Sequence, residues 1–289
     1  MKGLALQAES LTRCFKDNVA VDNVSFDVAF GEVVGLLGAN GAGKTTTIRM
    51  LVGLLEPSSG HAMLLGAPPS RESQRRLGYV PQGLGLYGDL TVSENLRFTA
   101  DAYGIETRVL TGPLLESSNR LVRDISLGLQ RQLAFTSAVQ HVPDALILDE
   151  PTSGVGPLAA ARLWDQIRHE AEREVGVLVT THSMQEARQC DRLVLLSEGS
   201  VVGRGMESDI VAGLTAIEVT ADMWSDAFSA LTTTGAIVTL DGRSVRVIDQ
   251  SRETVERTLH DACVAATIKI LPATIDERMA SLARAAATG

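Results

Sequence analysis

The feature that most constrains the fold of this chain is a glycine-rich loop between an apolar run and a helical run. Residues 38–45 read Gly-Ala-Asn-Gly-Ala-Gly-Lys-Thr and fit the pattern G-x-x-x-x-G-K-[ST]. Residues 33–37 are continuously apolar, which is typical of a strand covered on both faces, and residues 44–53 predict a short helix that ends at glycine. A plain glycine-rich turn has no use for the Lys-Thr pair, so this context predicts a phosphate-binding loop.

Each residue type in this loop has a role in binding phosphate. Glycines let backbone N–H groups surround phosphate oxygens, and the start of the following helix adds the positive end of its dipole. Lys44 supplies a point charge for the β- and γ-phosphates, and the hydroxyl of Thr45 is a ligand for Mg²⁺. We therefore expect a nucleoside-triphosphate site whose binding residues are Gly38, Ala39, Asn40, Gly41, Ala42, Gly43, Lys44, Thr45 and Thr46.

An acidic pair follows a second apolar run at residues 145–148. A strand there would present Asp149 at its carboxyl end, where the carboxylate can hold Mg²⁺ through water, and Glu150 would be placed to polarise an attacking water. An acidic pair alone is a weak signal, because a solvated strand end has the same composition. Together with the phosphate loop upstream, it favours the functional interpretation.

The order of the predicted elements indicates two domains. Buried strands alternate with helices over the first two hundred residues, which favours an α/β fold with a largely parallel sheet. After about Gly213 the pattern changes to short alternating strands and two helical runs in the order β-α-β-β-α-β, the split arrangement of a ferredoxin-like unit. We expect a nucleotide-binding domain at 1–213 and a small α+β accessory domain at 214–289.

Composition excludes several other classes of protein. The 26 Lys and Arg against 35 Asp and Glu, for a net charge of −9, argue against an overall basic groove for nucleic acid. The three cysteines lie far apart and form no C-x-x-C pair, so a zinc site or a disulfide framework is not expected. No stretch approaches the roughly 20 apolar residues of a membrane span, and the first residues lack the apolar core of a signal peptide.

Four further segments, in this order, make the chain resemble the ATP-binding subunit of an ABC transporter over about residues 1–213. Phe15 stands where that family places an aromatic that stacks on adenine. Residues 79–82, Tyr-Val-Pro-Gln, resemble the Q-loop. Residues 125–132, Ile-Ser-Leu-Gly-Leu-Gln-Arg-Gln, resemble the signature that begins Leu-Ser-Gly-Gly, and Thr-Thr-His at 180–182 resembles the switch histidine. The resemblance implies a P-loop NTPase core of the ABC type with a helical subdomain.

The resemblance also implies roles for individual residues. Nucleotide domains of this family pair head to tail, so the Ser126 hydroxyl and the Gly128 amide would contact the γ-phosphate held by Lys44 of the other protomer. Gln82 would touch Mg²⁺ and face the membrane partner, and His182 would contact the γ-phosphate and help to place the water. The expected catalytic residues are thus Glu150, His182 and Gln82, and the expected Mg²⁺ ligands are Thr45, Gln82 and Asp149.

Three features depart from the family pattern. Leu127 replaces the first signature glycine, although it spares the two phosphate-contacting positions. Gly156 stands where the family normally has an aspartate, and a glycine has no carboxylate with which to couple the two sites across the dimer. The helical stretch between Gln82 and Ser126 is short for the family. These departures predict slower hydrolysis, or a chain that works beside a different partner subunit.

The amino-acid sequence around the motifs most resembles that of exporter ATPases of the daunorubicin and multidrug type. This implies an ATP-hydrolysing subunit that energises export of a drug-like or lipid-like substrate at the cytoplasmic face of the membrane. Its partners would be separate multi-span permease subunits and a second ATP-binding subunit, identical or not, with no nucleic acid. Two alternatives stay open: a soluble ABC ATPase that acts on the ribosome or nucleic acid, and a weakly hydrolysing regulatory subunit. The transported substrate is not readable from the sequence.

Overall fold

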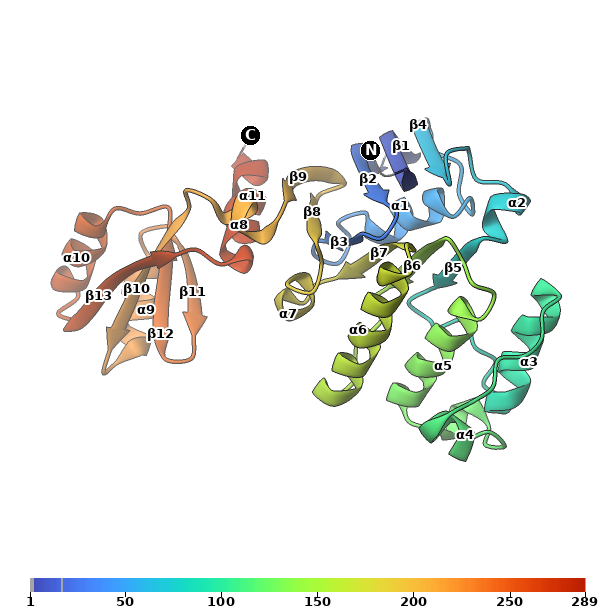
Figure 1. The fold of residues 1–289 in the computed structure, drawn as a ribbon. Helices are drawn as coiled ribbons and strands as arrows, with labels where there is room; N and C mark the ends of the chain where they lie inside the picture. Colours follow the sequence, from blue (N-terminus) through green and yellow to red (C-terminus); the bar gives the residue numbers. More distant parts are fainter. Residues whose placement is uncertain (1–2, 17, 289) are drawn as a thin grey trace. The chain divides into compact units, whose positions relative to one another are not determined.

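The computed structural model describes residues 3–16 and 18–288, which form two compact units divided between Gly203 and Arg204 (Figure 1). The predicted boundary lay ten residues later, after residue 213. The difference arises because helix α8 (Glu207–Val211) packs against the last helix, α11 (Ile275–Thr288), and so belongs to the second unit.

The first unit is built on a six-stranded sheet with the strand order β5-β6-β7-β3-β8-β9. The pairs β5–β6, β6–β7, β7–β3 and β3–β8 are parallel. The largely parallel α/β sheet predicted from the apolar runs is therefore observed. Its strands are β3 (Val33–Leu37), β5 (Leu77–Val80), β6 (Ala145–Asp149), β7 (Gly176–Thr181), β8 (Arg192–Ser197) and β9 (Ser200–Gly205).

Both faces of this sheet are covered, which explains why its central strands β3, β6 and β7 are apolar up to the polar residues at the carboxyl ends of β6 and β7. Val34 and Leu36 of β3 point into a core shared with helix α1 and a three-stranded antiparallel sheet of order β2-β1-β4. Val33 and the alternate residues of β6 and β7 point into a second core formed with helices α5 and α6. These covering elements are β1 (Leu4–Phe15), β2 (Asn18–Ala29), β4 (Ser59–Leu64), α1 (Lys44–Leu51), α5 (Leu127–Val139) and α6 (Pro157–Glu172).

A smaller apolar core holds together the helices between Gln82 and the end of α5. It includes Leu96 of α3, Leu114 of α4 and Leu133 of α5. This group is the helical subdomain that the resemblance implied, and Figure 1 shows α3, α4 and α5 gathered at one end of the unit, away from β1 and β4. The remaining helices of the unit are α2 (Arg71–Gln74), α3 (Val92–Tyr103), α4 (Gly112–Glu116), the 3-10 turn η1 (Val122–Asp124) and α7 (Met184–Ala187).

The second unit contains an antiparallel sheet of order β11-β12-β10-β13. Helices α9 and α10 contribute to a core on one face of it, and the chain order is the β-α-β-β-α-β predicted from the sequence. A buried ion pair between Arg246 of β12 and Glu277 ties α11 to the sheet. The elements are β10 (Thr215–Ala221), α9 (Trp224–Thr232), β11 (Ile237–Asp241), β12 (Ser244–Ile248), α10 (Arg252–Asp261) and β13 (Ala266–Pro272).

Within the described residues, no helix combines the length and the apolar character that a membrane crossing requires.

Candidate functional site

At two positions of the glycine-rich loop, neighbouring backbone leaves no space for a side chain. Gly43 has a φ of +99°, and a Cβ there would lie 2.7 Å from the carbonyl oxygen of Ala20. A Cβ on Gly38 would lie 2.5 Å from the carbonyl oxygen of Leu196. The loop is thus held close to neighbouring backbone, and α1 begins directly after it at Lys44.

Lys44 points back into the loop that precedes it. Its Nζ donates hydrogen bonds to the carbonyl oxygens of Gly38, at 2.7 Å, and Ala39, at 3.1 Å, and the side chain is 6% exposed. Burial lowers the pKa of this amine, while the nearby Glu150 and Asp149 carboxylates act in the opposite direction. The amine is therefore a nearly buried cation that faces two acidic residues.

Asp149 and Thr45 form an oxygen-rich corner at the carboxyl end of β6. Asp149 is 2% exposed and accepts hydrogen bonds from Thr45 Oγ1, at 3.2 Å, and from Thr180 Oγ1, at 2.5 Å. A hydroxyl and a carboxylate are the ligands that Mg²⁺ prefers, usually completed by water and substrate phosphates. Among the described residues, no group of three or more His, Cys, Asp or Glu side chains lies close enough together to hold a metal ion.

Glu150 lies beside this corner in an uncommon backbone conformation. It has a φ of +51° and is 7% exposed, and its N–H donates to Thr180 Oγ1 at 2.9 Å. His182 Nδ1 lies 3.3 Å from Glu150 Oε1, with the His182 side chain 59% exposed. Strained backbone of this kind clusters at functional sites. The carboxylate is thus placed next to an imidazole at the edge of the loop.

Residues predicted to bind phosphate and residues predicted to be catalytic line one pocket. Exposed Gln82, which follows β5, reaches the same space as the glycine-rich loop and Glu150. The pocket is lined by Ala20, Asn40, Gly41, Gly43, Lys44, Thr45, Thr46, Gln82 and Glu150.

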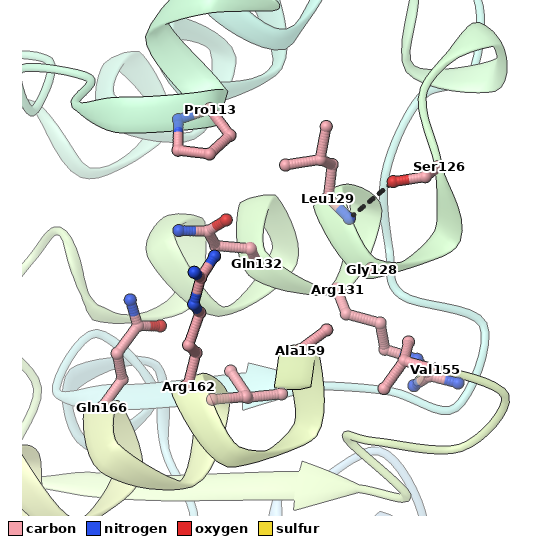
Figure 2. A pocket seen from close by; sticks show the side chains of 11 residues that line it. Pro113, Ser126, Gly128, Leu129, Arg131, Gln132, Val155, Ala159, Arg162 and Gln166 are labelled. Carbon is pink, nitrogen blue, oxygen red and sulfur yellow. Dashed lines mark hydrogen bonds between the residues drawn. The ribbon is translucent and has the colours of Figure 1, made fainter. Parts of the chain in front are cut away.

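Other predicted residues lie outside this pocket. Phe15 is 44% exposed at the end of β1, where the Arg13 guanidinium lies 4.7 Å from its ring centre. Ser126 caps α5, and its Oγ accepts a hydrogen bond from Leu129 N at 3.4 Å (Figure 2). With Gly128, it lines a separate cavity between α5 and α6 of about 160 Å³. One copy of the chain therefore does not bring Ser126 and Gly128 to Lys44.

Sequence reasoning assigned no role to two buried residues that support the site. Thr180 is 0% exposed and bridges Asp149 and Glu150 through its hydroxyl. Arg131 is 8% exposed and donates to the carbonyl oxygens of Glu150, at 2.8 Å, and Ser153, at 2.9 Å. In the sequence, Arg131 stands between Gln130 and Gln132 in the segment that resembles the signature, and nothing there marks it as buried.

Residue 156 does not need to be glycine. It has a φ of −70° at the start of α6, and a Cβ there would meet nothing within 4 Å. Gly154, two residues earlier, has a φ of +78°, and a Cβ on it would lie 2.9 Å from Leu127 Cδ2. The missing carboxylate at 156 is thus a chemical difference that the fold does not require.

Residues 21–153 match the family model described as ABC transporter. The probable multidrug ABC transporter ATP-binding protein YbhF of Escherichia coli is 41% identical over 219 residues, which are 72% of this chain but only 38% of that protein. The chain thus spans well under half the length of that relative. The Nod factor export ATP-binding protein I of Paraburkholderia xenovorans is 38% identical over 235 residues, 76% of this chain and 77% of that protein.

Solved structures share the fold of the first unit. An ATP-binding subunit of an ABC transporter has 31% identity and a TM-score of 0.65, over 71% of this chain and 91% of that one. The dimeric ABC transporter cassette MJ0796 has 21% identity and a TM-score of 0.62, over 70% of this chain and 98% of that one. The second likeness concerns the fold alone.

Proposed function

Because this chain belongs to the family of ABC transporter ATP-binding proteins, we propose that it binds and hydrolyses ATP to energise export through separate membrane subunits. The observation that carries the proposal is the meeting of Lys44, Gln82 and Glu150 in one pocket, with Asp149 hydrogen-bonded to Thr45 at its edge. A phosphate-binding loop, an oxygen corner for Mg²⁺ and a carboxylate for water are the parts that ATP hydrolysis needs.

The chain's own residues would share the chemistry as follows. The loop N–H groups and Lys44 would hold the β- and γ-phosphates, replacing the two carbonyl contacts that Lys44 now makes. Thr45, Asp149 and Gln82 would hold Mg²⁺, which supplies charge neutralisation at the phosphates. Glu150 would orient and polarise the attacking water, with His182 beside it.

A second copy or a related subunit would complete the site. Ser126 and Gly128 lie outside the pocket that holds Lys44, so their contact with a γ-phosphate requires another protomer. Gln82 lines the nucleotide pocket and is exposed to solvent. It would transmit the closing motion of the site to a permease at the cytoplasmic face of the membrane. The cargo we propose is drug-like or lipid-like, because relatives bear the names multidrug transporter and Nod factor export protein.

The decisive experiment compares the wild-type chain with Glu150→Gln. We expect the wild type to hydrolyse ATP with Mg²⁺, and the variant to bind ATP but accumulate as an ATP-bound dimer, because water activation is lost while the binding residues stay. Turnover by phosphate release and mass by light scattering measure the two effects. A wild type without turnover contradicts the proposed activity, and an E150Q variant that turns over at the wild-type rate contradicts the role of Glu150.

A further inference from the structure

Helix α5 holds the backbone at two points of the loop between β6 and α6, at Glu150 and at Ser153. Arg131 reaches from α5 to the carbonyl oxygens of Glu150 and Ser153, at 2.8 and 2.9 Å. Figure 2 shows its side chain leaving α5 toward the loop that carries Val155. Because these bonds join a buried cation to backbone oxygens, they fix the position of the loop relative to the helix.

Leu127 contacts the same loop from one turn earlier on the helix. Residues four apart lie on one side of a helix, so Leu127 and Arg131 face the loop together. The Cδ2 of Leu127 lies so close to Gly154 that a Cβ there would be only 2.9 Å away. Gly154 has a left-handed φ of +78°, which already favours glycine. Leu127 therefore occupies the space that a side chain on residue 154 would need.

We propose that Leu127 and Arg131 form a clamp through which α5 positions Glu150 for hydrolysis. The proposal rests on the catalytic role proposed above for Glu150. Leu127 is a positioning residue in it, because it touches the loop after Glu150 and no reacting atom. The leucine that replaces the first signature glycine thus gains a contact that a glycine could not make.

The clamp links two nucleotide sites of a dimer without a carboxylate at residue 156. Ser126 and Gly128, which flank Leu127, are the residues expected to meet the nucleotide bound to the other protomer. A shift of the start of α5 on that contact would move Leu127 and Arg131, and with them the backbone of Glu150. Gly156, by contrast, has no side chain, and a Cβ added there would meet nothing within 4 Å, so it makes no such side-chain contact.

The charge of Arg131 suits this position. Burial acts to lower the pKa of its guanidinium, and the carboxylates of Glu150 and Glu186 act to raise it. The cation therefore lies in the field of the proposed catalytic carboxylate as well as on its backbone. Its Nε is buried and has no hydrogen-bond partner among the described residues, a cost that a purely packing side chain would not carry.

The test compares Leu127→Ala, Leu127→Met and the control Leu115→Ala. Leu115 is 55% exposed on α4, and Leu127 is 39% exposed on α5, so neither truncation empties a core. We expect L127A to lower kcat about fivefold, the effect of losing about 1 kcal/mol in the transition state, with KM for ATP unchanged. L127M keeps a side chain over Gly154 and should retain most of the wild-type kcat, and L115A should match the wild type.

A second measurement removes any ambiguity about folding. In a double-mutant cycle, Gly154→Ala should lower the melting temperature less in the L127A background than in the wild type, because the clash with Leu127 Cδ2 is gone. Equal costs in both backgrounds, or a kcat for L127A equal to that of the wild type, would overturn the clamp while leaving the proposed function intact. A rise in KM with kcat unchanged would also overturn it. A wild type without ATP turnover would overturn the proposed function and the clamp together.

Discussion

The hydroxyl of Thr180 donates a 2.5 Å hydrogen bond to the carboxylate of Asp149, at the edge of two adjacent parallel strands. The same oxygen accepts the N–H of Glu150 at 2.9 Å. One buried hydroxyl therefore orients both the expected Mg²⁺ ligand and the backbone of the expected catalytic carboxylate.

Replacing Thr180 by valine should impair the site without changing its shape. Val lacks the hydroxyl, so it leaves a buried carboxylate oxygen of Asp149 without its donor, at about 1 to 3 kcal/mol, and leaves the Glu150 N–H with only the Thr180 carbonyl oxygen at 3.2 Å. We expect lower turnover and a higher Mg²⁺ requirement, measured by phosphate release against Mg²⁺ concentration. Thr180→Ser is the matched control, since it keeps the oxygen. A T180V enzyme with normal Mg²⁺ dependence would contradict the orienting role.

Replacing Lys44 by alanine should remove most of the affinity for ATP. A charge-assisted hydrogen bond contributes about 1.5 to 3 kcal/mol, which is roughly a 10- to 100-fold change in affinity. Binding of a fluorescent ATP analogue to wild type and variant measures the loss. Lys269→Ala, an exposed lysine of β13, is the control and should bind as the wild type does. Unchanged affinity in K44A would refute the assignment of the phosphate loop.

Introducing aspartate at residue 156 should raise ATP turnover if the missing carboxylate limits it. The position accepts a side chain, because a Cβ there meets nothing within 4 Å, and aspartate is favoured at the N-cap that residue 156 forms for α6. The turnover of Gly156→Asp measures the effect, and its melting temperature should not fall. Gly154→Asp is the contrasting variant and should melt lower, because of its φ of +78° and the nearby Leu127. An unaltered rate in G156D would show that the gap at 156 does not limit hydrolysis.

The second unit should lose stability in acid through Glu277. Burial acts to raise the pKa of this carboxyl, but hydrogen bonds from Arg246 and Thr274 prevail, so its pKa lies below the ordinary value. A group with a depressed folded pKa stabilises above its unfolded pKa of roughly 4.3, and this stabilisation disappears as pH falls through the folded pKa.

Urea unfolding between pH 6 and pH 3 checks this expectation. Trp224 lies in the second unit, and Trp164→Phe removes the only other tryptophan, so fluorescence then reports on that unit. Glu277→Gln should lose about 3 to 5 kcal/mol at neutral pH, because Arg246 is left buried without an opposite charge, and the stability of the variant should vary less with pH. An identical pH profile for E277Q and the W164F parent would exclude Glu277 as the cause.

Local sequence patterns predicted the parts of the site that lie within single segments. The loop at 38–45, the strand before it and the acidic pair after β6 are each encoded by neighbouring residues, so their pattern survives in the linear chain. Parallel strands bring such segments to one edge of a sheet, and Lys44, Glu150 and Gln82 accordingly share one pocket. The stacking role of Phe15 stays a prediction.

Contacts between distant segments could not be read in the same way. The observed boundary between the two units lies before the predicted one because α8 packs against α11, which begins more than sixty residues later in the chain. Thr180 acquires its role only when β7 pairs with β6, and Leu127 acquires its role only when α5 approaches the loop after β6.

The sequence by itself therefore determined the class of fold, the phosphate loop and the residue types available for ATP chemistry, because these depend on local spacing and on the alternation of buried segments. Only the tertiary structure decided which side chains support Asp149 and Glu150. It also decided that residue 156 has space for a side chain, whereas residue 154 has none. Those properties depend on distances of a few ångströms between elements far apart in the chain, and packing of the whole core sets such distances.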